Sequence, residues 1–196
     1  MTPPAQPIFD PANKAVLFSQ ERQILVPRDT ILAFSMVLPG MTVADCGCGN
    51  GYLLEHFSRA VGPTGQVLAS DLQESMLVDA RTLVTDQRLS NVILAVSGPE
   101  TLPIPDGVCD RVILCHVWHD IVDREQWCRE AARVLKSTGE LVIVNWEPIL
   151  TEPGPVVWRR WSMLQTTAFL SAQGWTVTRA ASLTWAIYGV AARLSS

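Results

Sequence analysis

The stretch of residues 41–57 constrains the fold of this chain more than any other. A short apolar run ends in Asp45, and three glycines follow at alternate positions, Gly47, Gly49 and Gly51. Apolar side chains then recur at helical spacing. This order predicts a buried strand, a tight turn and the first turns of a helix. Glycine adopts positive φ and lets a ligand approach the backbone, and the free N–H groups at the start of a helix face that ligand.

The glycine turn can be interpreted in three ways. A dinucleotide fingerprint, G-x-G-x-x-G, needs its third glycine at position 52, which is Tyr52 here, and it does not include Asp45. The pattern D-x-G-x-G-x-G instead resembles motif I of the class I methyltransferases that use S-adenosylmethionine. An ordinary strand, turn and helix of another α/β fold is the third interpretation, so the context along the chain has to decide.

Predicted strands and helices alternate along the rest of the chain. Residues 1–13 are proline-rich and predict an irregular arm, which helices at 19–26 and 28–38 follow. Later helices are predicted at 51–60, at 73–87, after Asp123, and from Trp158 to Gly174. Strands are predicted at 66–70, 91–96, 110–115 and 140–146, with a terminal hairpin at 175–182 and 184–194. Such alternation gives parallel strands with right-handed crossovers.

The fold prediction is an α/β, three-layer Rossmann-like methyltransferase fold. The resemblance implies a seven-stranded, mostly parallel sheet with an antiparallel last strand. We expect a single domain over residues 1–196, in which residues 1–38 form an N-terminal helical arm or lid. At 196 residues the chain is long enough for one substantial core.

Several polar residues fall where predicted strands end. Asp45, Asp71, Gly98, His116 and Glu147 all occupy such positions. Ligands of parallel α/β sheets bind beyond the carboxyl ends of the strands. Asp71 lies 20 residues after Gly51, where an acid can accept hydrogen bonds from ribose hydroxyls. It could also cap the helix at 73–87, and the two roles are compatible.

Within the superfamily the chain most resembles the group of ubiquinone and menaquinone C-methyltransferases. The segments that carry the resemblance are LPGMTVADCGCGNGY, the acid in LASD, LPIPDGVCDRVI, HVWHDI and AARVLKSTGELVIVNWEP. It implies S-adenosylmethionine as cofactor, with the three glycines around its methionine part, Asp45 near its ammonium group and Asp71 on its ribose. The full set of cofactor-binding residues expected is Asp45, Gly47, Gly49, Asn50, Gly51, Asp71, Leu72, Gly98, Pro99, Cys115 and His116.

Two departures from that group shape the expected site. The acid that often accepts the adenine amino group after the third strand is replaced by Gly98, followed by Pro99. Adenine recognition then depends on backbone groups and on apolar contact with Leu72 and Leu102. The connector after the fifth strand is also short, about a dozen residues. The cover of the acceptor is therefore expected from residues 1–38 or from a partner subunit.

Composition excludes several other classes of protein. The net charge of −4 disfavours a general nucleic-acid surface, and no apolar run reaches the length of a membrane span. The start of the sequence lacks the features of a signal peptide. Five cysteines, an odd number, are typical of reduced thiols in the cytoplasm. Cys46 and Cys48 lack a second pair with ligand spacing, so no metal site is predicted.

Methyl transfer is an in-line displacement in which positioning supplies much of the rate. A base is needed only when the acceptor arrives protonated. His116 and His119 follow the fourth strand and are the candidate catalytic residues, although either could simply pack. If the loop after this strand is extended, His119 reaches over the sulfonium and acts as the base, while His116 stays near the methionine part of the cofactor. We expect transfer to a small-molecule acceptor, without nucleic acid or membrane, by a cytoplasmic monomer or homodimer. The alternatives are an RNA or protein methyltransferase on the same fold and a non-catalytic protein that binds S-adenosylmethionine.

Overall fold

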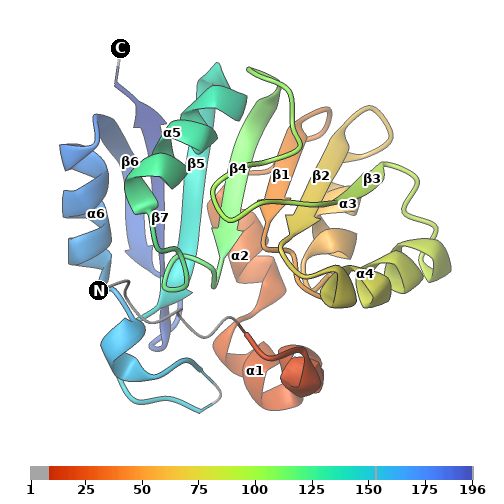
Figure 1. Ribbon diagram of the computed structural model, residues 1–196, viewed down its shortest axis with the longest axis horizontal. Helices are drawn as coiled ribbons and strands as arrows, with labels where there is room; N and C mark the ends of the chain where they lie inside the picture. The colour runs from red at the N-terminus through yellow and green to blue at the C-terminus, as the bar shows by residue number, and fades with distance from the viewer. Residues whose placement is uncertain (1–8, 153, 196) are drawn as a thin grey trace.

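A single sheet of seven strands organises the computed structural model, which describes residues 9–152 and 154–195 (Figure 1). The strand order is β3-β2-β1-β4-β5-β7-β6. All neighbours up to β5 pair in parallel, and β7 runs antiparallel to both β5 and β6. The strands are β1 (Thr42–Cys46), β2 (Gln66–Asp71), β3 (Val92–Val96), β4 (Cys109–Cys115), β5 (Leu135–Trp146), β6 (Trp175–Ser182) and β7 (Ile187–Leu194). The predicted fold class is confirmed.

Helices cover both faces of this sheet. They are η1 (Pro11–Phe18), α1 (Gln20–Leu25), α2 (Arg28–Ser35), α3 (Leu54–Val61), α4 (Glu74–Asp86), α5 (Arg124–Val134), η2 (Val157–Arg159) and α6 (Met163–Ala172). Buried side chains of α2, α3 and α4 form one apolar cluster, and those of α5 and α6 form another. No helix in the described ranges has the length and apolar character needed to cross a membrane.

Strand β5 shows why its sequence is an almost unbroken apolar run. Val142 and Val144 belong to the first cluster, whereas Leu141 and Ile143 belong to the second. Successive side chains of a strand point to opposite faces. A central strand with helices on both faces therefore needs apolar residues at every position.

Several predicted boundaries were wrong. The helix expected to run from 28 to 38 ends at Ser35, because Met36 takes a left-handed conformation. The helix expected from Trp158 begins at Met163, because Ser162 and Gln165 form a capping box there. The strand expected from Glu140 begins at Leu135, which pairs with Cys109 before a register shift. The helix expected from residue 51 begins at Leu54.

The two ends of the chain differ from the prediction in smaller ways. The loop of the terminal hairpin spans residues 183–186, so its second strand starts at Ile187. The irregular arm predicted for residues 1–13 lies partly outside the described residues, and Pro11 already begins the 3-10 helix η1.

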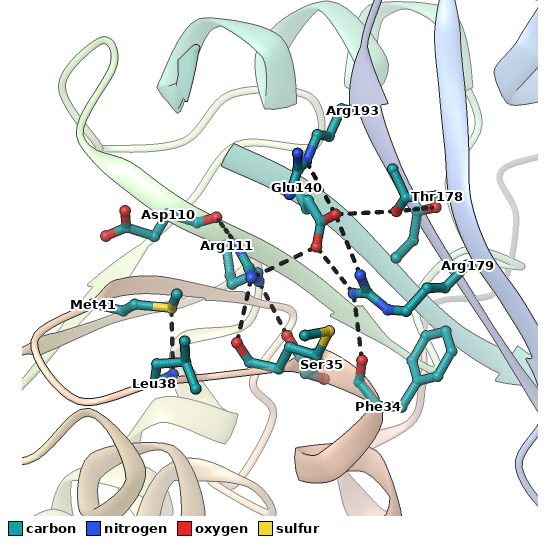
Figure 2. Close-up of polar contacts among 12 residues, drawn as sticks. Phe34, Ser35, Leu38, Met41, Asp110, Arg111, Glu140, Thr178, Arg179 and Arg193 are labelled. Carbon is teal, nitrogen blue, oxygen red and sulfur yellow. Dashed lines mark hydrogen bonds and ion pairs between the residues drawn. The ribbon is translucent and has the colours of Figure 1, made fainter. Parts of the chain in front are cut away.

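A polar cluster at the amino-terminal side of β4 and β5 fastens α2 to the sheet. Figure 2 shows Arg111, Arg179 and Arg193 converging on Glu140, which is 1% exposed. The Glu140 carboxylate accepts hydrogen bonds from Arg179 at 3.0 Å and Arg193 at 3.1 Å, and it pairs with Arg111 at 3.6 Å. Arg111 also donates to the carbonyl of Ser35 at 3.1 Å. The arginines thus satisfy carbonyls that the end of α2 leaves free.

Candidate functional site

The glycine turn after β1 is fixed by the end of β2. The N–H groups of Gly47 and Cys48 both donate to the carbonyl of Ser70, at 2.7 and 2.9 Å. Gly47, Gly49 and Gly51 have φ angles of 76°, 57° and 96°, in the region that favours glycine. The turn therefore depends on all three glycines for its shape, as their spacing predicted.

Asp71 closes the turn from the adjacent strand. One carboxylate oxygen accepts the N–H of Gly49 at 2.9 Å, and the other accepts the N–H of Gln73 at 2.9 Å. The N-cap of α4 is Gln73, so Asp71 supports the start of that helix without being its cap. Each carboxylate oxygen accepts more than one hydrogen bond. Asp71 can therefore hold the turn and still accept bonds from ligand hydroxyls.

Asp45 is a buried acid beside the turn, with only 2% of its surface exposed. Burial raises the pKa of Asp45 to about 7, and the negative charge of Asp71 adds to this rise. Burial also raises the pKa of Asp71 itself. Two desolvated carboxyls near one turn create a place where a positive charge is stabilised.

His116 occupies the position directly after β4 in a left-handed conformation, with φ of 60°. Its N–H donates to the carbonyl of Val144 at 2.8 Å, and its ring lies 4.7 Å from that of Trp146. Both ring nitrogens are buried and have no hydrogen-bond partner among residues 9–152 and 154–195. Burial lowers the pKa of His116 well below its usual value. A strained backbone and a neutral imidazole at this edge are typical of a functional position.

The side chain of His119 is buried, and the residue lies in the loop between β4 and α5. The loop is a turn rather than an extended segment, because the N–H of Asp120 donates to the carbonyl of Val117 at 2.8 Å. Nδ1 of His119 lies 2.9 Å from Oδ1 of Asn145, and Nε2 lies 3.4 Å from the carboxylate of Asp120. Burial lowers the pKa of His119, with Asp120 opposing the shift. Both ring nitrogens therefore face atoms of this chain.

The residues predicted to contact adenine separate into two groups. Leu72 is 40% exposed, and the strand ends next to it are joined by the N–H of Ser97 donating to the carbonyl of Asp71 at 3.0 Å. Gly98 and Pro99 follow directly, so these three predicted residues come together. Leu102 instead lies in the core cluster with α5, and its N–H donates to Glu130 at 2.7 Å. It offers no exposed apolar surface to a ligand.

The N-terminal segment crosses this edge of the sheet, which sequence reasoning expected only in outline. Nε2 of Gln73 donates to the carbonyl of Phe9 at 2.8 Å, and Nδ2 of Asn50 donates to that of Lys14 at 3.2 Å. The hydroxyl of Tyr52 donates to the carbonyl of Val26 at 2.7 Å. In Figure 1 the red N-terminal helices lie at the same edge as the arrowheads of β1, β2 and β4. No sequence signal marked these individual contacts.

Unsatisfied buried atoms around the turn fit a polar ligand. Oδ1 of Asn50 and both ring nitrogens of His116 lack partners in the described part of the chain. Buried polar atoms are nearly always hydrogen-bonded in native proteins. Together with the glycine turn and the two acids, they match a nucleoside that carries an amino-acid group. Among the described residues, no group of three or more His, Cys, Asp or Glu side chains is arranged to hold a metal ion.

The sheet order, the glycine turn after β1 and the acid at the end of β2 define the fold of class I methyltransferases. A family described as "Methyltransferase domain" matches residues 44–143, which is just over half of the chain. The chain belongs to this methyltransferase domain family.

Individual relatives agree with that family. The ubiquinone/menaquinone biosynthesis C-methyltransferase of Shewanella frigidimarina is 35% identical over 108 residues, covering 55% of this chain and 43% of that protein. The protein of the same name from Escherichia coli O1:K1 / APEC is 34% identical over 120 residues, covering 61% of this chain and 48% of that protein. The chain therefore matches less than half the length of these curated relatives.

A solved structure is similar over almost the whole chain. The SAM-dependent methyltransferase from Aquifex aeolicus has a TM-score of 0.90 and 29% sequence identity, and the match covers 95% of this chain and 100% of that one. The N-terminal and C-terminal elements beyond the family match are therefore part of a known arrangement.

Proposed function

We propose that this protein transfers a methyl group from S-adenosylmethionine to a small-molecule acceptor. The observation that carries the proposal is the glycine turn, which Asp71 ties to the end of β2 beside the buried Asp45. Family membership supports a methyltransferase cofactor at this turn. When bound, S-adenosylmethionine supplies an activated methyl group on a sulfonium centre.

The residues of the turn are assigned to parts of the cofactor by their chemistry. Asp71 presents carboxylate oxygens that suit two ribose hydroxyls, and Asp45 presents a carboxyl that suits an ammonium group. Leu72, Gly98 and Pro99 form the side on which an adenine ring fits. The Cys115 thiol is neutral, because burial raises its pKa to about 12, so its role is contact rather than chemistry.

The catalytic roles of His116 and His119 stay predictions. His116 has a neutral ring with two nitrogens that no described residue uses. His119 is engaged by Asn145 and Asp120. We infer that His116 is the better candidate to take a proton from an acceptor, and that His119 orients the neighbouring loop.

A comparison of two variants tests this assignment once an acceptor is known. Asn tolerates the left-handed conformation, so His116→Asn should fold normally and lose a factor of about 10²–10⁴ in turnover. His119→Ala should lose less. Because burial lowers the pKa of His116 below its usual value, the wild-type rate should decline only below about pH 6.5. A larger loss in His119→Ala would reverse the two roles.

We also propose that residues 9–38 form a lid over the cofactor. The contacts of Phe9, Lys14 and Val26 with residues around the turn support this role, and lids commonly order when ligand binds. Hydrogen exchange in this segment should slow when S-adenosylhomocysteine is added. Exchange that is identical with and without ligand would contradict the lid.

The remaining assignments follow from composition and burial. Five free cysteines, four of them buried, fit a reducing compartment, and we propose a cytoplasmic monomer or homodimer. The net charge of −4 favours a small molecule over RNA as acceptor. An RNA or protein acceptor, or cofactor binding without transfer, would be found by assaying methyl transfer from labelled cofactor to each class.

Ligand-dependent melting tests the cofactor itself. S-adenosylhomocysteine at about 100 times its Kd should stabilise the native state by about 2.7 kcal/mol, which raises Tm by about 5–10 °C for a chain of this size. NAD serves as the control ligand and should leave Tm unchanged. Stabilisation by NAD but by neither S-adenosyl compound would overturn the proposal.

A further inference from the structure

Arg22, on the short helix α1, is a buried cation that has no carboxylate partner among residues 9–152 and 154–195. Its side chain is 7% exposed and lies 4.4 Å from the centroid of the Tyr52 ring. The guanidinium makes one hydrogen bond to the part of the chain that the structure describes, from Nη1 to the carbonyl of Leu17 at 3.0 Å. An arginine carries five N–H donors. Most of its hydrogen-bonding capacity is therefore unused by the residues that the structure describes.

Two other buried arginines have partners for their guanidinium groups. Arg111 pairs with Glu140, and Arg160 donates to the carbonyl of Ile149 and to the hydroxyl of Thr151 at 2.8 Å. A buried charge without a counter-ion is costly. The contrast indicates that Arg22 is reserved for a group that the described part of the chain does not supply.

The position of Arg22 places that group at the cofactor edge. Tyr52 comes directly after Gly51, the last glycine of the turn. At the end of β4, burial lowers the pKa of His116 and the charge of Arg22 lowers it further. Burial raises the pKa of Cys115, and the same charge opposes that rise. The guanidinium is thus within electrostatic reach of both the glycine turn and the end of β4.

We propose that Arg22 binds the carboxylate of the amino-acid part of S-adenosylmethionine. This inference rests on the proposed cofactor. An amino-acid group is a zwitterion, and the site then offers a complementary pair, with the buried Asp45 for the ammonium group and Arg22 for the carboxylate. A guanidinium binds a carboxylate through two parallel hydrogen bonds. The lid thereby contributes a ligand-binding side chain, and cofactor binding would draw α1 onto the turn.

Calorimetry with two ligands tests the proposal. S-adenosylhomocysteine and its decarboxylated analogue differ only in the carboxylate, and both keep the ammonium group for Asp45. The wild-type protein should bind S-adenosylhomocysteine about 10- to 100-fold more tightly than the analogue, since charged hydrogen bonds of this kind are strong. Arg22→Met keeps the apolar length of the side chain and should reduce this preference to less than about threefold.

Arg28→Met is the matched control. Arg28 also lies over the Tyr52 ring, at 4.6 Å, so its loss removes a similar stacking cation. This variant should retain the wild-type preference for the carboxylate. An equal loss of both ligands in Arg22→Met would show that Arg22 only packs the lid, and would overturn the proposal.

The wild-type measurement is decisive even where Arg22→Met does not fold. Equal binding of the two ligands by wild-type protein would overturn the role of Arg22 while leaving the cofactor assignment intact. Binding of neither ligand would refute the proposed function instead. The two failures are therefore distinguishable.

Discussion

Replacement of Asp45 by asparagine should stabilise the ligand-free protein at alkaline pH. Asp45 is 2% exposed, and burial raises its pKa from 3.8 to about 7, with Asp71 adding to the shift. The native state therefore holds a proton that the unfolded chain has released at intermediate pH. The free energy of unfolding falls as pH rises from about 4 to about 7, by about 4 kcal/mol at 1.36 kcal/mol per pKa unit.

The asparagine side chain does not ionise, so Asp45→Asn removes this pH-dependent loss. About 2–3 kcal/mol of it falls between about pH 5 and about pH 8. For a chain of this size that corresponds to a Tm difference of about 5–10 °C. The gain in Tm of the variant over wild type should therefore be larger by this amount at about pH 8 than at about pH 5.

The assay is thermal unfolding of both proteins at the two pH values, without ligand. Asp86→Asn, at the exposed end of α4, is the control and should shift Tm little at either pH. The same Asp45→Asn variant should bind S-adenosylhomocysteine more weakly, because it loses the charge that faces the ammonium group. A gain in Tm that is the same at both pH values would refute the desolvation of Asp45.

Three further variants test the surrounding structure. Asp71→Ala should lower the affinity for S-adenosylhomocysteine by about 1.5–3 kcal/mol in calorimetry, and unchanged affinity would leave Asp71 only a support for the turn. Gly47→Ala should lower Tm more than Gly62→Ala. Both glycines have positive φ, but only at Gly47 would the new Cβ lie 2.4 Å from the side chain of Val117. Equal effects on Tm would contradict this close approach. Glu140→Gln should lower the free energy of unfolding, measured in urea, by about 2–4 kcal/mol. The loss is smaller than for a fully buried ion pair because Arg193 is half exposed. An unchanged free energy of unfolding would mean that the arginines find other acceptors.

The sequence predicted the sheet and its helices because their signals are local. Alternate glycines favour a tight turn because they adopt positive φ without a steric penalty. An apolar run such as residues 141–144 is typical of a central strand covered on both faces. Boundaries were less predictable where tertiary pairing extends an element. Strand β5 gains residues 135–139 through its pairing with β4, and the composition of that segment does not indicate this.

The candidate site was predictable in part for the same reason. Asp45, Asp71 and the three glycines are adjacent to predicted strand ends, so their gathering at one edge follows from parallel topology. Leu102 was placed wrongly, because the prediction could not show that Glu130 binds its N–H and draws it into the core. His119 was expected in an extended loop, whereas the bond between Val117 and Asp120 closes a turn.

The sequence by itself determined the class of fold, the turn and the acids that border it. These features depend on residue type and spacing over short stretches of chain. Only the tertiary structure decided that Arg22 is buried and that Asp71 binds Gly49. It also decided that, among the described residues, Arg22 has no carboxylate partner and the ring nitrogens of His116, unlike those of His119, have no hydrogen-bond partner. Burial and charge pairing are set by segments distant in sequence. No local pattern encodes which partner a side chain will meet, or whether it will meet one.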